Sequence, residues 1–131
     1  FIGLGQLDKA DEINVCREAN FRLYQDQIMN SYWKPLYRPG CFVSNFAYPV
    51  IHPKRNEIVQ ALVSANVEVR PMICRSMGVQ PFYVKQYGKK ILKNADVVDK
   101  FGLYVPNHPS LTSTQILSVC SIINDVIGEN R

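Results

Sequence analysis

The sequence predicts one α/β domain, an α+β-like two-layer sandwich with a three-stranded sheet and flanking helices. Its 131 residues fit a single domain with a single core. Hydrophobic residues make up 47% and charged residues 20%, proportions that exclude disordered and fibrous classes. Segments with strand character alternate with segments of helical periodicity, in the order helix, strand, helix, strand, helix, strand, helix.

Residues 1–32 have the periodicity of one long amphipathic helix. Apolar residues recur there at steps of three and four, as from Leu4 to Leu7 and from Phe21 through Tyr24 to Ile28. Such a helix is longer than a small domain can cover, so its first turns would expose apolar surface. We therefore expect a partner or upstream sequence to cover the start of the helix.

The first strand is expected over residues 41–51, which are rich in aromatic and β-branched side chains. Alternation would place residues 42, 44, 46 and 48 on one of its faces. Pro53 suits the first turn of the helix that follows. Asn66 suits the left-handed conformation that ends this helix.

The second half of the chain predicts two more strands and three helices. The strands are expected at residues 67–73 and 102–109, and the helices at residues 81–87, 91–101 and 112–128. The last helix has a strong start signal, because Thr112 and Gln115 have the spacing of a capping box. The strand directions stay open: the first two strands could pair in parallel as neighbours, or run antiparallel to a strand between them.

Charge and cysteine usage predict few special partners. The formal charge is +4, and the basic residues are scattered except for one run in residues 88–93. We interpret that run as a solvated face and therefore expect no nucleic-acid partner. The cysteines lack metal-site spacing and are expected to be reduced and buried: Cys16, Cys41, Cys74 and Cys120. No apolar run reaches the roughly 18 residues that span a bilayer, so we expect a cytoplasmic protein without a membrane partner.

Candidate binding residues lie at the end of the second strand and in the loop that it leads into. Arg70 precedes Pro71, which favours an extended backbone that aims the arginine at the edge of the domain. A guanidinium there can bind a phosphate, a carboxylate or a sugar oxygen. The competing interpretation is a salt bridge to Glu68 or Asp99. Arg75, Ser76 and Gln80 continue the same loop.

Asn107 and His108 follow the third predicted strand, between two prolines. The histidine can donate a hydrogen bond to a substrate or act as a general acid near neutral pH. It can equally cap nearby backbone groups, and the sequence does not decide between these roles.

Three motifs carry a resemblance to a known family. "GLGQLDKADEINVCREANFRLY", "NEIVQALVSANVEVRPM" with "QPFYVK", and "FGLYVPNHPSLTSTQI" resemble the C-terminal part of DegT-type sugar-nucleotide aminotransferases and the related sugar 3-dehydratases. The resemblance covers nearly the whole chain. It implies a homodimeric pyridoxal-phosphate enzyme of the aspartate-aminotransferase fold that acts on a nucleotide-linked keto-deoxysugar. Residues 1–131 would then be its single C-terminal small domain, with residues 1–32 as connector helix and residues 41–131 as the sandwich.

The same resemblance implies that the chemistry lies elsewhere. In the family, the Schiff-base lysine, or the histidine that replaces it in dehydratases, lies upstream of the "GLGQLDK" stretch. We therefore expect no catalytic residue, no bound cofactor and no turnover from this chain alone, which lacks the large cofactor domain. Its part would be to shape the substrate pocket through Arg70, Arg75, Ser76, Gln80, Asn107 and His108.

A second hypothesis comes from a different class. The chain could be a self-standing α/β module that dimerises through its first helix and binds an anionic small molecule at the Arg70 loop. Whether the natural gene places a lysine- or histidine-bearing cofactor domain before Phe1 discriminates the two hypotheses.

Overall fold

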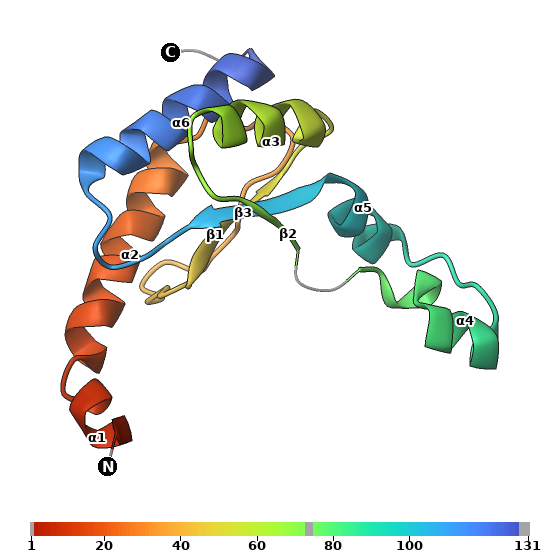
Figure 1. Ribbon diagram of the computed structural model, residues 1–131, viewed down its shortest axis with the longest axis horizontal. Coiled ribbons are helices and arrows are strands. Elements are labelled where there is room, and N and C mark those ends of the chain that lie inside the picture. The colour runs from red at the N-terminus through yellow and green to blue at the C-terminus, as the bar shows by residue number, and fades with distance from the viewer. Residues whose placement is uncertain (1, 73–74, 129–131) are drawn as a thin grey trace.

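Helices cover one face of a three-stranded sheet in the computed structural model, which describes residues 2–72 and 75–128 (Figure 1). The strands are β1 (Ala47–Ile51), β2 (Arg70–Pro71) and β3 (Gly102–Pro106), in the spatial order β1-β3-β2. Both pairings are antiparallel. The last strand in the sequence is therefore the central one, and it separates the first two strands.

The strands are shorter than predicted, because prolines and side chains interrupt the ladder. β1 begins only at Ala47, which pairs with Pro106 at the end of β3. Pro106 has no N–H to extend the ladder, and beyond it the Asn107 side chain donates to the Asn45 carbonyl. β2 ends at Pro71 for the same lack of a donor.

The described residues form six helices and one short 3₁₀ turn. They are α1 (Ile2–Leu7), α2 (Ala10–Gln27), α3 (Arg55–Ser64), η1 (Met77–Val79), α4 (Pro81–Tyr87), α5 (Lys93–Phe101) and α6 (Ser113–Ile127).

The prediction of one helix over residues 1–32 is wrong at two points. The helix is interrupted by a turn at Asp8 and Lys9. There the Lys9 N–H donates to the Gln6 carbonyl, three residues earlier, at 3.2 Å. The second helix ends at Gln27, because Asn30 turns the chain: its Oδ1 accepts from the backbone N–H groups of residues 32 and 33.

Local signals at most of the other helix ends are confirmed. Pro53 is an exception, because α3 begins only at Arg55 and the proline therefore lies outside its first turn. Asn66 has φ 58°, the left-handed conformation expected after α3. The Thr112 side chain and Gln115 form the capping box in both directions at the start of α6, and Gly128 ends that helix with φ 80°. The bounds of α4 agree with the prediction.

The core lies between the sheet and helices α2, α3 and α6. Its largest fully buried side chains are Phe21, Tyr24, Ile28, Tyr48, Val50, Ile58, Leu62, Leu103, Val105, Ile116 and Ile123. Tyr24 and Tyr48 stack with ring centroids 5.0 Å apart, and both hydroxyls are bonded, to the Pro106 carbonyl and to Gln25 Oε1. Burial raises the pKa of both phenols well above the ordinary value.

The cysteine prediction is only partly right. Cys120 is buried on α6, and burial raises the pKa of its thiol to about 12. Cys16 is half-buried, while Cys41 is exposed, because residues 41–46 form no strand. All three are free thiols. The predictions for Phe1, Ile73 and Cys74 fall outside the described residues.

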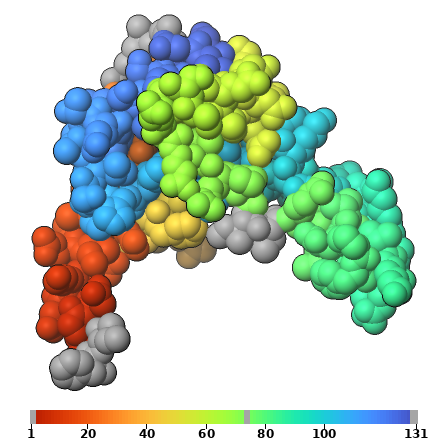
Figure 2. All heavy atoms as spheres, in the orientation of Figure 1, coloured from red at the N-terminus to blue at the C-terminus, as the bar shows by residue number. Residues whose placement is uncertain are grey.

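Residues 75–101 form an arm that projects from the body of the molecule, opposite the projecting start of α1 and α2 (Figure 2). Neither α4 nor α5 contains a buried residue. The arm is closed on itself where the Lys90 N–H bonds the Gly78 carbonyl at 3.1 Å. A Cβ at residue 78 would lie 2.1 Å from the Lys90 carbonyl oxygen, so this crossing requires glycine.

Candidate functional site

The sheet face turned away from the helices, here called the open face, carries Arg70. Residues paired across antiparallel strands share a face. The register therefore places Pro49, Tyr104 and Arg70 in one row across β1, β3 and β2. The adjacent pairs, Tyr48 with Val105 and Val50 with Leu103, are buried and face the core.

Three adjoining hollows lie on the open face, and Tyr104 lines all of them. The first, about 510 Å³, is bounded by Phe46, Ala47, Pro49, Met72 and the polar residues Ser44 and Asn45. The second, about 240 Å³, lies between Phe46 and Arg70. The third, about 440 Å³, runs along β2 past Arg70 to Met72. The open face therefore offers a continuous surface that joins aromatic rings to one guanidinium.

Arg70 forms the predicted ion pair with Glu68. Its Nε and Nη2 both donate to Glu68 Oε1, and the Nε contact is 3.0 Å. This hydrogen bonding to Glu68 raises the pKa of Arg70 above its ordinary value. A guanidinium has five N–H donors, so the pair orients the fork and leaves donors for an anionic ligand.

The other loop residues belong to the arm. Arg75 is exposed and lies 3.5 Å from Asp99, so each arginine pairs with one of the two acids considered above. Ser76 is buried, and its Oγ has no hydrogen-bond partner among the described residues. Gln80 joins η1 to α4 as the residue before Pro81. A substrate contact from these three residues stays a prediction.

Asn107 is completely buried, unlike a residue on an open pocket wall. Its Nδ2 donates to the Arg17 carbonyl at 3.0 Å and to the Asn45 carbonyl at 2.7 Å. The side chain therefore holds α2, residue 45 and the end of β3 together. A substrate contact from Asn107 also stays a prediction.

His108 is exposed and forms a local turn. Its Nδ1 lies 2.7 Å from Ser110 Oγ and accepts from the Ser110 N–H at 3.2 Å, and its carbonyl accepts from Asn20 Nδ2. The capping role that the sequence left open is therefore present. A role toward a substrate would use its other ring nitrogen.

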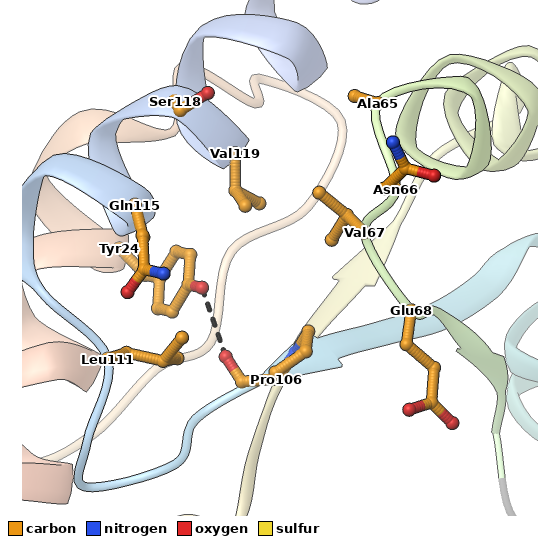
Figure 3. Close-up of a pocket in the computed structure, with 10 residues that line it drawn as sticks. All are labelled: Tyr24, Ala65, Asn66, Val67, Glu68, Pro106, Leu111, Gln115, Ser118 and Val119. Carbon is orange, nitrogen blue, oxygen red and sulfur yellow. Dashed lines mark hydrogen bonds between the residues drawn. The ribbon is translucent and has the colours of Figure 1, made fainter.

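A further hollow of about 320 Å³ lies on the helix side, between α6 and residues 65–68 (Figure 3). Tyr24, Val67, Leu111 and Val119 supply apolar surface, and the Tyr24 hydroxyl bonds the Pro106 carbonyl. Gln115 at its rim is engaged in the capping box. No lysine or arginine of the described residues lines this hollow, so for an anionic ligand it is a weaker candidate than the open face.

Sequence reasoning missed Phe46 and Tyr104 as site residues. Phe46 was expected to share a face with Tyr48, but it lies before the first paired residue and contacts Tyr104 on the open face. One signal could have revealed Tyr104, since in "GLYVP" the tyrosine alternates with Leu103 and Val105. Within the described residues, no group of acidic, histidine and cysteine side chains could hold a metal ion.

Comparison with known proteins identifies the family. The profile of the DegT/DnrJ/EryC1/StrS aminotransferase family matches residues 1–124. The chain belongs to this family. No curated protein matches the sequence. In the part of the chain that the structure describes, no helix has both the length and the apolar character needed to cross a membrane.

Solved structures of several enzymes share the fold. An E. coli GDP-4-keto-6-deoxy-D-mannose-3-dehydratase with bound hydrated PLP is 24% identical, with a TM-score of 0.77 over 93% of this chain and 33% of its own. A Brucella abortus family aminotransferase has a TM-score of 0.82 at 17% identity, covering 93% and 33%. A Helicobacter pylori aminotransferase of pseudoaminic acid biosynthesis has a TM-score of 0.79 at 22% identity, covering 98% and 36%. The present chain thus spans about a third of each.

Proposed function

We propose that this chain is the substrate-pocket-forming C-terminal small domain of a PLP- or PMP-dependent enzyme that aminates or dehydrates a nucleotide-linked keto-deoxysugar. The family match over residues 1–124 carries the proposal. The proposal includes both amination and dehydration, because the solved structures with this fold include a 3-dehydratase and aminotransferases. Residues 1–32 would connect to a large cofactor domain, and residues 41–131 would form the sandwich.

The described residues do not fit covalent attachment of the cofactor. Pyridoxal phosphate supplies an electron sink when it is bound, and its lysine must be depressed in pKa by burial or by a cationic neighbour. Every lysine of this chain lies within the described residues, and each is exposed or half-buried. Lys34 and Lys54 are engaged with backbone carbonyls. The cofactor would therefore be held by a domain outside these residues.

The contribution of this chain is binding and orientation. Arg70 on the open face would bind a phosphate or carboxylate of the substrate, with Glu68 fixing the plane of its guanidinium. Arg75, Ser76, Gln80, Asn107 and His108 would complete the pocket from the arm and the β3 loop. We infer that the working enzyme is a cytoplasmic homodimer, and that residues 1–131 alone have no turnover.

An absorbance scan of the purified full-length protein tests the proposal. A bound pyridoxal cofactor absorbs between roughly 320 and 430 nm. Adding a nucleotide-linked 4-keto-6-deoxysugar and an amino donor should shift this absorbance band. Product mass then separates amination from dehydration. A full-length protein with neither a band nor turnover on any such sugar would overturn the proposal. The matched control is the chain of residues 1–131, for which we expect neither signal.

A further inference from the structure

Two aromatic rings stand together on the open face, outside the core. Phe46 and Tyr104 form an edge-to-face pair with ring centroids 5.6 Å apart and planes at 74°. Phe46 is 57% exposed, although large apolar side chains are usually buried. Such a contact occupies one face of only one ring, so aromatic faces are left for a ligand.

The surroundings of the pair are those of a ring-binding site. The hollow of about 510 Å³ beside both rings is otherwise walled by Ala47, Pro49 and Met72, with Ser44 and Asn45 as polar groups. A planar ring with polar edges would find apolar contacts for its faces. For its rim, the Ser44 oxygen can still accept a hydrogen bond while its hydroxyl donates to Asn14 Oδ1 at 2.9 Å, and Asn45 supplies a side-chain amide. Ligand sites commonly combine apolar walls with a few such polar groups.

A single cation lies at the far side of the same ring pair. The hollow of about 240 Å³ connects Phe46 and Tyr104 to Arg70. Arg70 pairs directly with Tyr104 in the sheet register, so the guanidinium and the Tyr104 ring project from neighbouring strands on one face, and Phe46 lies against Tyr104 just before β1. This arrangement places an anion-binding fork next to a stacking surface.

We propose that Phe46 and Tyr104 form the stacking surface for the nucleobase of a nucleoside diphosphate, with Arg70 binding the diphosphate. The inference rests on the proposed function, to which it adds the part of the nucleotide sugar that this chain binds. Stacking on aromatic side chains tolerates any base, because every base has a π-face. Arginine suits phosphate because its planar fork donates two parallel hydrogen bonds.

Calorimetric titration of the full-length protein with two kinds of ligand separates the two parts of the site. Uridine and guanosine 5′-diphosphate carry the base, while inorganic pyrophosphate carries only the charge. Phe46→Ala should weaken both nucleoside diphosphates by about 10- to 100-fold, the range of one base–aromatic stack. It should leave pyrophosphate binding unchanged.

Further variants control for folding and for burial. Phe46→Tyr keeps the ring and should bind as the wild type does, whereas Phe46→Leu keeps apolar bulk and should lose the stacking gain. Phe82→Ala is the matched control, because Phe82 is 62% exposed on α4 and lines none of the three hollows. It should change no affinity.

Variants of the ion pair between Arg70 and Glu68 should change the affinity for pyrophosphate, which Phe46→Ala should leave unchanged. Arg70→Gln should weaken pyrophosphate and both nucleoside diphosphates alike. Glu68→Gln should tighten pyrophosphate, because the carboxylate that repels the ligand is removed while an amide oxygen still contacts Arg70. Unchanged pyrophosphate affinity in both variants would overturn the assignment of the diphosphate to Arg70.

The inference and the proposed function fail in different ways. If the full-length enzyme turns over its sugar and Phe46→Ala binds nucleoside diphosphates as the wild type does, the stacking site is wrong and the enzyme assignment stands. If nucleoside diphosphates bind through Phe46 but neither cofactor band nor turnover exists, the enzyme assignment is wrong and the stacking site stands.

Discussion

Buried polar side chains fix the loops around the open face, and Asn107 is the clearest case. Its amide nitrogen donates to the Arg17 carbonyl on α2 and to the Asn45 carbonyl before β1, and neither carbonyl lies in a strand. Replacing Asn107 with alanine should lower the free energy of unfolding by about 1–3 kcal/mol, because both carbonyls would lose a buried partner. Urea unfolding measures this loss.

The matched control for Asn107 is the exposed Asn94 on α5. Asn94→Ala should change the free energy of unfolding by less than about 0.5 kcal/mol. A loss in Asn107→Ala no larger than in this control would contradict the bracing role.

The Cys120 thiol predicts an alkaline limit to stability. Burial raises its pKa from the ordinary 9.0 to about 12, so in this interval the unfolded chain releases a proton that the folded chain retains. The contribution of Cys120 is complete below pH 9 and is lost as the pH rises toward 12, at no more than about 1.4 kcal/mol per pH unit.

Unfolding of the wild type and of Cys120→Ala across pH 8 to about 11 tests this linkage. The wild type should lose its advantage over the variant as the pH rises. Tyr24 and Tyr48 add the same trend to both proteins, because burial raises their pKa values too. A constant difference between the two proteins would refute the assignment to Cys120.

At the scale of the element, the start of α6 can be tested by removing its cap. Thr112→Ala should lower the free energy of unfolding by about 1 kcal/mol, since the Gln115 N–H would lose its side-chain acceptor. Thr114→Ala, at the second residue of the same helix and also exposed, is the control and should cost much less. Equal losses would contradict a specific role of the capping box, because alanine has the higher helix propensity and propensity alone would stabilise both variants.

Elements with local signals were predictable, and those fixed by pairing were not. Pro81 and the capping box at Thr112 mark helix starts within a few residues, so α4 and α6 were found. Strand order depends on contacts between residues far apart in sequence, which is why the central position of β3 was left open. The lengths of β1 and β2 depend on prolines that act only once the register exists.

The candidate site shows the same division. Arg70 was predicted because it precedes a proline at the end of a strand, and it does lie on the open face. Phe46 and Tyr104 were missed, because their proximity requires β3 to lie beside β1 and β1 to begin at Ala47. The aromatic part of the site exists only in the paired sheet.

At the scale of the whole molecule, charge and packing are divided between body and arm. Residues 75–101 contain six basic and two acidic residues, a net charge of +4, which equals that of the entire sequence. The body is therefore neutral overall. The arm also lacks buried side chains in α4 and α5, so its local stability should be the lower of the two.

Limited trypsin digestion tests this difference. The first cuts should fall in residues 85–93, where exposed lysines lie in and between two short helices, with Lys89 and Lys90 in the connection. Mass spectrometry of the early fragments identifies the cut. First cleavage after Arg17 or Arg22, within α2, would contradict a weakly held arm.

The central place of β3 also bears on how the protein is made. β1 and β2 leave the ribosome well before residues 102–106, and neither can pair with the other in the finished sheet. Both strands therefore remain unpaired until β3 has been synthesised. Unpaired strand edges make nascent chains prone to aggregate. A transcript that stops before residue 102 would yield a product with helices but without a sheet, and we expect such a product to need chaperones or to be degraded.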